Sequence, residues 1–125
     1  VGLSGADMGA LYLLPRIVGQ GKASELLFLG DAIDAQEALR IGLANRVVPH
    51  EKLMEEAYSL ARRLKEGPLY ALGVTKELLN AEADMGLEAA LETEAMAQAR
   101  CMQSRDFREG YRAFIEKRPP QFNRT

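Results

Sequence analysis

The sequence is poor in the residues that mark several classes of protein. Its 125 residues include no tryptophan and one cysteine, Cys101, and aromatic residues make up only 6%. A single cysteine excludes an internal disulfide and fits a reducing compartment, so we expect a cytoplasmic protein. No apolar run approaches the roughly 20 residues that a membrane-spanning helix needs, and we therefore expect no membrane partner.

An excess of charge of either sign is also missing. The chain has 16 Lys and Arg residues against 18 Asp and Glu residues, which gives a formal net charge of −2. Nucleic-acid binding depends on cations that neutralise phosphates, so we expect no nucleic-acid partner. The one histidine, His50, has no ligand partner near it in the sequence, and Glu92 and Glu94 would point to different faces of a helix. The sequence therefore predicts no metal site.

What remains is an ordinary globular balance, with 47% hydrophobic and 27% charged residues. Gly-rich residues 1–7 indicate the end of a strand that runs into a turn. Residues 9–17 predict a short buried helix, which should stop or kink before Pro15 because proline lacks an N–H and crowds the preceding turn. A second helix is predicted over residues 22–28, with Gly30 as its stop.

The next segment predicts one helix and one strand. Asp34 and Glu37 have the spacing of a capping box, which predicts a helix over residues 35–41. Gly42 tolerates the left-handed conformation that commonly ends a helix. Residues 44–49 predict a short strand, because two β-branched valines favour extended backbone and a proline ends it.

From residue 50 onward, apolar residues recur at the spacing of one helix face. Gly67 and Pro68 predict the end of one such helix and the start of the next. Asp106 and Glu109 have capping-box spacing and predict the start of the last helix. The sequence thus predicts a mainly α chain with one or two short strands, divided near Pro49 into residues 1–49 and 50–125. The apolar stripe of the helix before the last contains Leu87, Ala90, Leu91, Ala95 and Met102.

Four short strings, in this order, resemble the second half of the enoyl-CoA hydratase/isomerase (crotonase) family. The strings are Val1-Gly2-Leu3 with Leu14-Pro15-Arg16-Ile17-Val18-Gly19; Ala23-Ser24-Glu25-Leu26 with Leu29-Gly30 and Ile33-Asp34-Ala35; Gly42-Leu43 with Asn45-Arg46-Val47-Val48-Pro49; and Glu109-Gly110, Ala113-Phe114, Glu116-Lys117-Arg118-Pro119-Pro120 and Phe122. They extend over nearly the whole chain.

The resemblance implies the C-terminal part of a crotonase-like α/β fold, a spiral of ββα units. Residues 1–49 would end the spiral core, and residues 50–125 would form a helical region that covers the active site and builds a homotrimer or hexamer. Such enzymes act on acyl-CoA thioesters in fatty acid metabolism through a stabilised thioester enolate. They hold no permanent cofactor, and coenzyme A enters as part of the substrate. The oxyanion hole and catalytic acids lie largely upstream, so we expect no independent activity from this piece.

Asp7 is the acid with the strongest claim to a catalytic role. Its place in the Gly-rich turn resembles that of an acid in dienoyl-CoA isomerases, although the alignment needs one inserted residue. A carboxylate in an apolar pocket can exchange protons near neutral pH. The alternative is that Asp7 caps the helix that follows it.

Phe114 and Lys117 match a Phe and a Lys that help to hold the CoA nucleotide in the family. A Lys provides a point charge for the 3′-phosphate, and an aromatic ring can stack on adenine. The alternative is that Phe114 packs in the core and Lys117 is a solvated cation at a helix end.

Two functions stay open from the sequence. The first is the C-terminal part of a hydratase or isomerase. The second is a helical oligomerisation module without catalysis, or a truncated product. The sequence does not separate hydration from double-bond migration, and it does not define the acyl chain.

Overall fold

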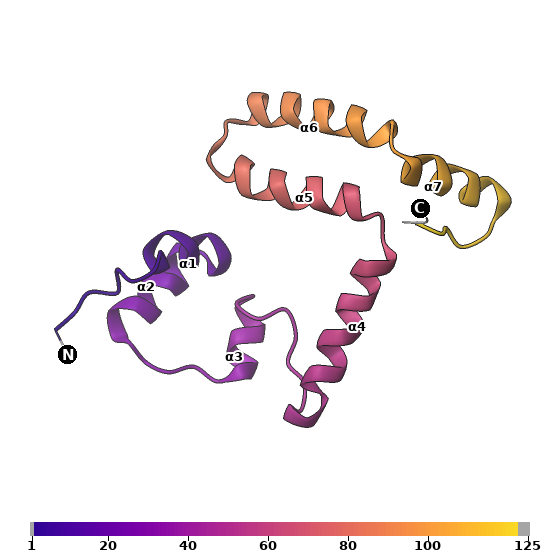
Figure 1. Ribbon diagram of the computed structural model, residues 1–125. Coiled ribbons are helices and arrows are strands. Elements are labelled where there is room, and N and C mark those ends of the chain that lie inside the picture. Colours follow the sequence, from indigo (N-terminus) through magenta and orange to yellow (C-terminus); the bar gives the residue numbers. More distant parts are fainter. Residues whose placement is uncertain (1, 123–125) are drawn as a thin grey trace. The chain divides into compact units, whose positions relative to one another are not determined.

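The computed structural model describes residues 2–122, and within that range all regular structure is helical (Figure 1). The elements are α1 (Ala10–Val18), α2 (Gln20–Leu29), α3 (Ala35–Arg40), η1 (His50–Lys52), α4 (Leu53–Glu66), α5 (Leu69–Ala81), η2 (Glu82–Asp84), α6 (Leu87–Met102) and α7 (Arg105–Glu116). The chain divides into two compact units, Val1–Lys52 and Leu53–Thr125.

Unit 1, Val1–Lys52, consists of short helices that end at glycines with positive φ. Gly19 separates α1 from α2 at φ 82°, and Gly30 ends α2 in the left-handed region, where its N–H donates to the Leu26 carbonyl. Only glycine enters that region without a steric penalty. These sharp reversals let α1 and α2 pack against each other, with Ala23 fully buried.

The start of α3 confirms the predicted N-cap. The Asp34 carboxylate accepts a hydrogen bond of 2.7 Å from the Glu37 N–H, and Gly42 follows the helix at φ 79°. The Glu37 carboxylate bonds Arg40 and Lys22 at distances of 2.6–3.1 Å. Lys22 belongs to α2, so Glu37 ties α3 to the preceding helix.

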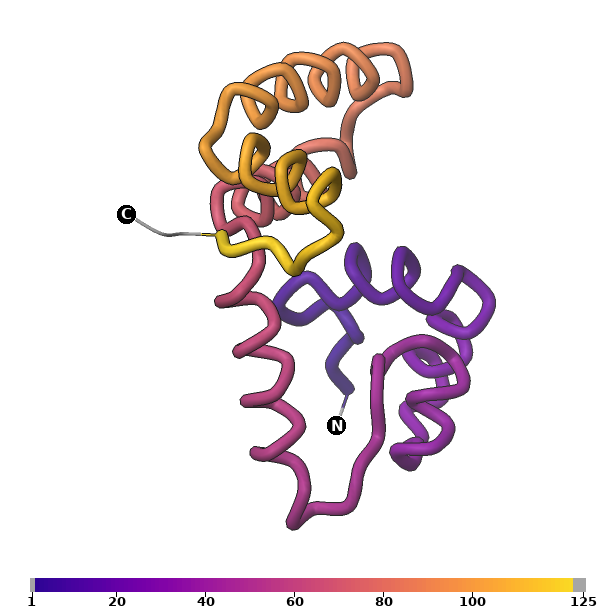
Figure 2. The backbone as a smooth tube through the Cα atoms, turned by 90° about the vertical axis from the view of Figure 1, so that its right-hand side faces the viewer, coloured from indigo at the N-terminus to yellow at the C-terminus, as the bar shows by residue number. Residues whose placement is uncertain are grey.

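Unit 2, Leu53–Thr125, is built from four longer helices. The tube in Figure 2 follows α5 into η2 and back along α6, and α5, α6 and α7 contact one another in sequence order. As predicted, α4 stops before Gly67, and Pro68 is the N-cap of α5. The C-terminal segment turns back beside α7, where Phe122 lies against Gly110.

The prediction of one or two strands is wrong for the described residues. Residues 2–7 are irregular, with bends at Gly5 and Asp7, and residues 44–49 form no strand. Val1, the first residue of one predicted strand, lies outside the described residues. A strand needs hydrogen bonds to a neighbouring strand, and two β-branched residues cannot form it without that partner.

Two predicted helix boundaries are also corrected. Helix α1 runs through Pro15 to Val18, because the fixed φ of proline suits a helix and only one hydrogen bond is lost.

Helix α7 begins one residue before the predicted capping box. Its N-cap is Ser104, whose hydroxyl accepts a 3.0 Å hydrogen bond from the Phe107 N–H. Glu109 is therefore free for another role.

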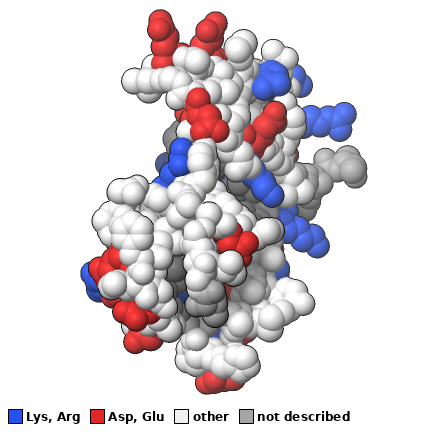
Figure 3. Space-filling model, turned by 90° about the vertical axis from the view of Figure 1, so that its left-hand side faces the viewer, with Lys and Arg blue, Asp and Glu red and all other residues white. Residues whose placement is uncertain are grey.

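The interior of the described chain contains only small side chains. The buried hydrophobic residues are Ala23, Ala97 and Ala113, whereas Leu87, Leu91 and many other large apolar side chains are exposed. The accessible surface is 10363 Å². Two separate compact domains with the lengths of the two units would expose only about 8,000 Å² together. Uncharged residues cover large areas of the face in Figure 3, and the exposed large apolar side chains come from both units, so apolar surface is available for a partner.

Two negative findings limit the classes of site. Within residues 2–122, no helix combines the length and apolar character that a membrane crossing requires. The same range holds no cluster of three His, Cys, Asp or Glu side chains that could bind a metal ion.

Candidate functional site

Asp7 lies in a tight turn that leads into α1. Its N–H donates to the Gly5 carbonyl at 3.0 Å, and its own carbonyl accepts from the Ala10 N–H at 2.8 Å. Met8 and Gly9 follow with φ values of 46° and 87°. Two successive residues with positive φ fix the backbone direction next to Asp7, and the Asp7 side chain is left exposed.

The alternative prediction, in which the Asp7 side chain caps α1, is wrong. The N-cap of α1 is Gly9, and no side chain caps this helix. Asp7 contributes its backbone carbonyl to the turn, so its carboxylate is not needed to begin α1. The turn also packs closely on α2, since a Cβ atom at Gly5 would lie 2.9 Å from a Leu27 methyl carbon.

Phe114 and Lys117 lie together at the C-terminal end of α7. Phe114 is 82% exposed, so the alternative that it packs in the core is wrong for the described chain. Lys117 is the C-cap, at φ 52° and ψ 40°, and its N–H donates to the Phe114 carbonyl at 3.3 Å. Lysine rarely adopts this left-handed conformation, so neighbouring contacts must stabilise it.

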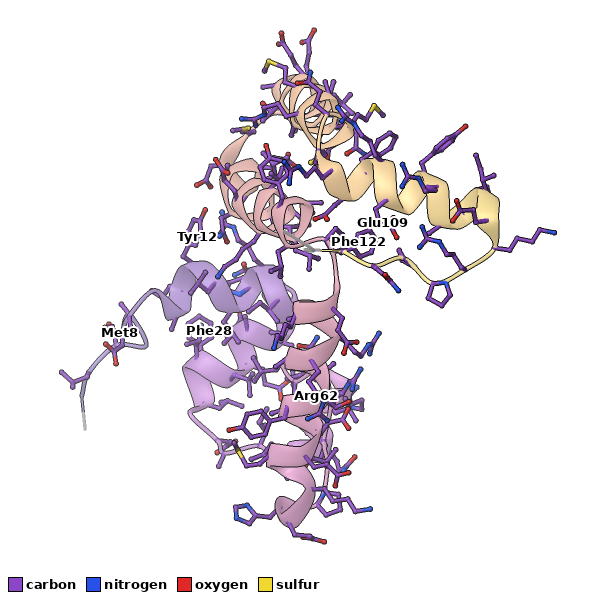
Figure 4. All side chains as sticks on the ribbon, turned by 45° about the vertical axis from the view of Figure 1, so that its right-hand side comes forward. Met8, Tyr12, Phe28, Arg62, Glu109 and Phe122 are labelled. Atoms are coloured by element: carbon purple, nitrogen blue, oxygen red, sulfur yellow. The ribbon has the colours of Figure 1, made fainter. Side chains whose placement is uncertain are left out.

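The Glu109 carboxylate on α7 binds the segment that follows this cap. It accepts two hydrogen bonds from the Arg118 guanidinium, at 2.6 and 3.1 Å, and a third of 2.9 Å from the Gln121 N–H. Arg118 also donates to Glu116 at 2.6 Å. We call Glu109, Arg118 and the Gln121 N–H the carboxylate clamp. In Figure 4, Glu109 lies beside the chain segment that carries Phe122.

The clamp changes the charge properties of its members. The Arg118 hydrogen bonds, followed by the Gln121 N–H, lower the pKa of Glu109 from 4.5 to about 2. The pKa of Arg118 is raised in turn by Glu109 first and Glu116 second. In unit 1 the same chemistry recurs, because Arg40 and then Lys22 lower the pKa of Glu37 to about 2. Both carboxylates are thus charged at neutral pH.

An aromatic groove of about 360 Å³ runs along α7. Its lining includes Phe107, Tyr111, Phe114 and Phe122, together with Pro68 and Ala71 from the start of α5 and Cys101 from α6. A volume of this size lies within the range of small-molecule pockets. Four aromatic rings contribute to the groove, and Lys117 follows three residues after one of them, Phe114.

A second groove, of about 550 Å³, lies between α5 and α6. Leu78, Leu91 and Ala97 line it with Cys101, and Thr75, Glu94 and Gln98 add polar atoms. It contains no clustered charges of one sign, so it resembles a surface for another helix more than a site for an anion. Cys101 borders both grooves.

The structure thus groups the predicted site residues in two places. Phe114 and Lys117 share the end of α7 in unit 2, whereas Asp7 belongs to unit 1. Sequence reasoning missed Glu109 and Arg118 as a pair and Phe122 as a groove residue. All three occur in the C-terminal string that carried the family resemblance. The spacing of Glu109 from Asp106 predicted a capping box, so its hydrogen bonds to Arg118 were not predicted.

Comparison with known proteins identifies the family. The model of the enoyl-CoA hydratase/isomerase family matches residues 1–125. The crotonyl-CoA hydratase of Syntrophomonas wolfei is 39% identical over 114 residues, which are 91% of this chain and 44% of that protein. The 1,2-epoxyphenylacetyl-CoA isomerase of Escherichia coli is 38% identical over 116 residues, with coverages of 93% and 44%.

Solved structures agree in fold. A Streptomyces coelicolor A3(2) protein that is assigned to the enoyl-CoA hydratases superposes with a TM-score of 0.93 at 52% identity, over 98% of this chain and 44% of that one. The chain therefore belongs to the enoyl-CoA hydratase/isomerase family. It spans somewhat less than half the length of the relatives that it matches.

Proposed function

We propose that this chain acts as the C-terminal part of an acyl-CoA hydratase or isomerase. The observation that carries the proposal is the family match over residues 1–125 together with the CoA-ester activities in the names of its relatives. The substrate would be an enoyl-CoA thioester, converted through a stabilised thioester enolate in the cytoplasm. Coenzyme A would be present only as part of the substrate. The oxyanion hole would come from the segment that the relatives have in addition.

Asp7 is the proposed proton-transfer residue. Its carboxylate is not used in capping α1, and its turn is held by backbone hydrogen bonds and by contact with α2. A fixed backbone with an uncommitted carboxylate suits an acid or base that must stay in one place. In this role Asp7 would take a proton from the acyl chain or return it there.

Phe114 and Lys117 are the proposed contacts for the nucleotide end of coenzyme A. The ring of Phe114 is 82% exposed beside the aromatic groove, which suits stacking on adenine. Lys117 follows one turn later and would bind the 3′-phosphate as a point charge.

The exposed apolar faces of unit 2 support an oligomer. Leu87, Leu91 and Met102 on α6 are 77%, 56% and 53% exposed. Apolar surface of this extent is typical of an interaction site. We therefore infer that residues 50–125 form the contact region of a trimer or hexamer. The same faces also favour the alternative function, a helical oligomerisation module without catalysis.

A hybrid hydratase tests the proposed function. The 114 matched residues of the Syntrophomonas wolfei crotonyl-CoA hydratase are replaced by the corresponding residues of this chain. We expect the hybrid to hydrate crotonyl-CoA, measured as loss of the enoyl-thioester absorbance, and the chain by itself to give no turnover. A folded hybrid that assembles normally but gives no turnover would favour the non-catalytic module.

A further inference from the structure

The carboxylate clamp connects the two kinds of side chain that a CoA nucleotide needs. Arg118 is adjacent in sequence to Lys117, and Gln121 is adjacent to Phe122. One carboxylate on α7 therefore binds the segment 117–122 at two points, the Arg118 side chain and the Gln121 N–H. The ring at its far end lies against Gly110 of α7, and a Cβ atom added there would be 3.6 Å from that ring.

Lys117 has a left-handed backbone at φ 52°, which a lysine rarely adopts. Its N–H donates to the Phe114 carbonyl, and the residues on its two sides, Glu116 and Arg118, are joined by a side-chain hydrogen bond of 2.6 Å. The Arg118 N–H also donates to the Ala113 carbonyl at 3.1 Å, which closes the end of α7. Without Glu109 the guanidinium would keep only Glu116 and the Pro119 carbonyl. Both lie within two residues of Arg118 in the sequence, so they cannot hold the segment against the middle of α7.

We propose that Glu109 is a positioning residue for the nucleotide end of the CoA thioester. Its carboxylate orders residues 117–122, so that Phe122 forms part of the wall of the aromatic groove, and Lys117 follows the groove residue Phe114 at the end of α7. Arg118 serves as the partner that makes this order rigid, since a bidentate guanidinium fixes direction as well as distance. The inference rests on the proposed function and adds to it the residues that preorganise the binding site.

The test uses the hybrid hydratase with Glu109→Gln. The matched control is Glu37→Gln in unit 1, which removes a carboxylate with the same lowered pKa and the same kind of arginine partner. The two substrates are crotonyl-CoA and crotonyl-pantetheine, which lacks the nucleotide. Suppose that Glu109→Gln lowers the fraction of molecules with an ordered segment 117–122 to about one tenth. The apparent Kd for coenzyme A then rises about tenfold.

We expect Glu109→Gln to raise the KM for crotonyl-CoA about tenfold, with kcat unchanged and with no change for crotonyl-pantetheine. Glu37→Gln should leave both substrates unaffected. Tryptic cleavage after Lys117 provides a readout that needs no ligand, and it should become faster in Glu109→Gln but not in Glu37→Gln. Arg118→Lys, which keeps the charge but not the bidentate geometry, should show the same pattern more weakly.

Three results would overturn the proposal. Equal losses for the two substrates would make Glu109 a general stability residue. Faster cleavage after Lys117 with unchanged KM would show that order in this segment does not serve binding, while the proposed function would stand. Failure of the unmodified hybrid to bind coenzyme A would instead reject the proposed function and the positioning role with it.

Discussion

Units 1 and 2 change chain direction by different means. In unit 1, described glycines at 2, 9, 19, 30 and 42 have positive φ, and they separate helices of six to ten residues. In unit 2, the described glycines at 67, 73, 86 and 110 have ordinary φ values, and helices of 12 to 16 residues turn at caps and short 3₁₀ segments. Backbone turns therefore shape unit 1, and helix faces shape unit 2.

The difference teaches where each kind of chemistry can be placed. A turn fixed by backbone hydrogen bonds can hold one carboxylate at a defined point, as it does for Asp7. A long helix can present a row of rings and a charged end, as α7 does with Phe114 and Lys117. The first arrangement suits the proton transfer proposed for Asp7, and the second suits the proposed contact with the nucleotide end of coenzyme A.

The largest expected effect concerns the turn in unit 1. In the hybrid hydratase, Asp7→Asn should lower kcat roughly 100-fold, the usual contribution of a positioned acid or base, with little change in KM. Asp31→Asn, which changes another exposed acid of unit 1, is the control and should have no effect. Steady-state hydration of crotonyl-CoA gives the measurement. A near-normal kcat for Asp7→Asn would remove this residue from the mechanism.

The next effect concerns the helix faces of unit 2. Leu91→Lys should weaken self-association of the hybrid about 30-fold, which corresponds to roughly 2 kcal/mol for an interface hot spot. Glu92→Lys places the same charge on the neighbouring position of α6 and serves as control. Light scattering over a range of concentrations measures the change. An unmodified hybrid that is monomeric and fully folded would contradict the oligomer prediction.

The exposed apolar side chains should also lower the stability of the chain when it is isolated. Leu11, Leu13 and Ile17 on α1 are 53%, 53% and 54% exposed, in addition to the faces on α6. We expect the isolated chain to bind a hydrophobic dye strongly and to be marginally stable. A cooperative thermal transition with little dye binding would show that units 1 and 2 fold stably without a partner.

Two Gly→Ala substitutions test whether glycines have different roles in units 1 and 2. Gly30→Ala places a Cβ at φ 70° and should destabilise the protein by roughly 1–2 kcal/mol. Gly73→Ala lies inside α5 with open space around the new methyl group and should stabilise it by about 0.5–1 kcal/mol. Thermal unfolding of the hybrid, followed by circular dichroism, reports both changes. Shifts of the same sign would contradict the distinction between the units.

The smallest effect is common to both units. The pKa values of Glu37 and Glu109 are lowered from 4.5 to about 2, so each ion pair contributes stability above pH 4.5 that is lost as the pH falls toward 2. Both side chains are solvent-accessible, so the loss should be modest and should shrink in high salt. Carboxyl carbon shifts measured by NMR should place both midpoints near 2. Midpoints near 4.5 would mean that the pairs do not form in solution.

Local signals predicted most of the helices, because they act between neighbours in the chain. Asp34, Gly30 and Pro68 fixed their helix ends as expected. The strand predicted over residues 44–49 does not form, because pairing with a neighbouring strand is not a local property. For the site, the family strings in the sequence predicted Phe114 and Lys117. The aromatic groove was not predicted, because Phe122 reaches it only where the chain after α7 turns back beside that helix. The clamp could have been anticipated only from the charge pattern of Glu109 and Arg118, nine residues apart.

Cys101 gives the chain a built-in probe position. It is the single cysteine, half-buried on α6, and it borders the aromatic groove on one side and the α5–α6 groove on the other. A thiol-reactive fluorophore would therefore attach at one place only. Its emission would respond to a ligand that enters the aromatic groove and to a helix that covers the other groove. Coenzyme A binding and subunit assembly could then each be followed, in separate titrations, by the emission of one label on the Sγ of Cys101.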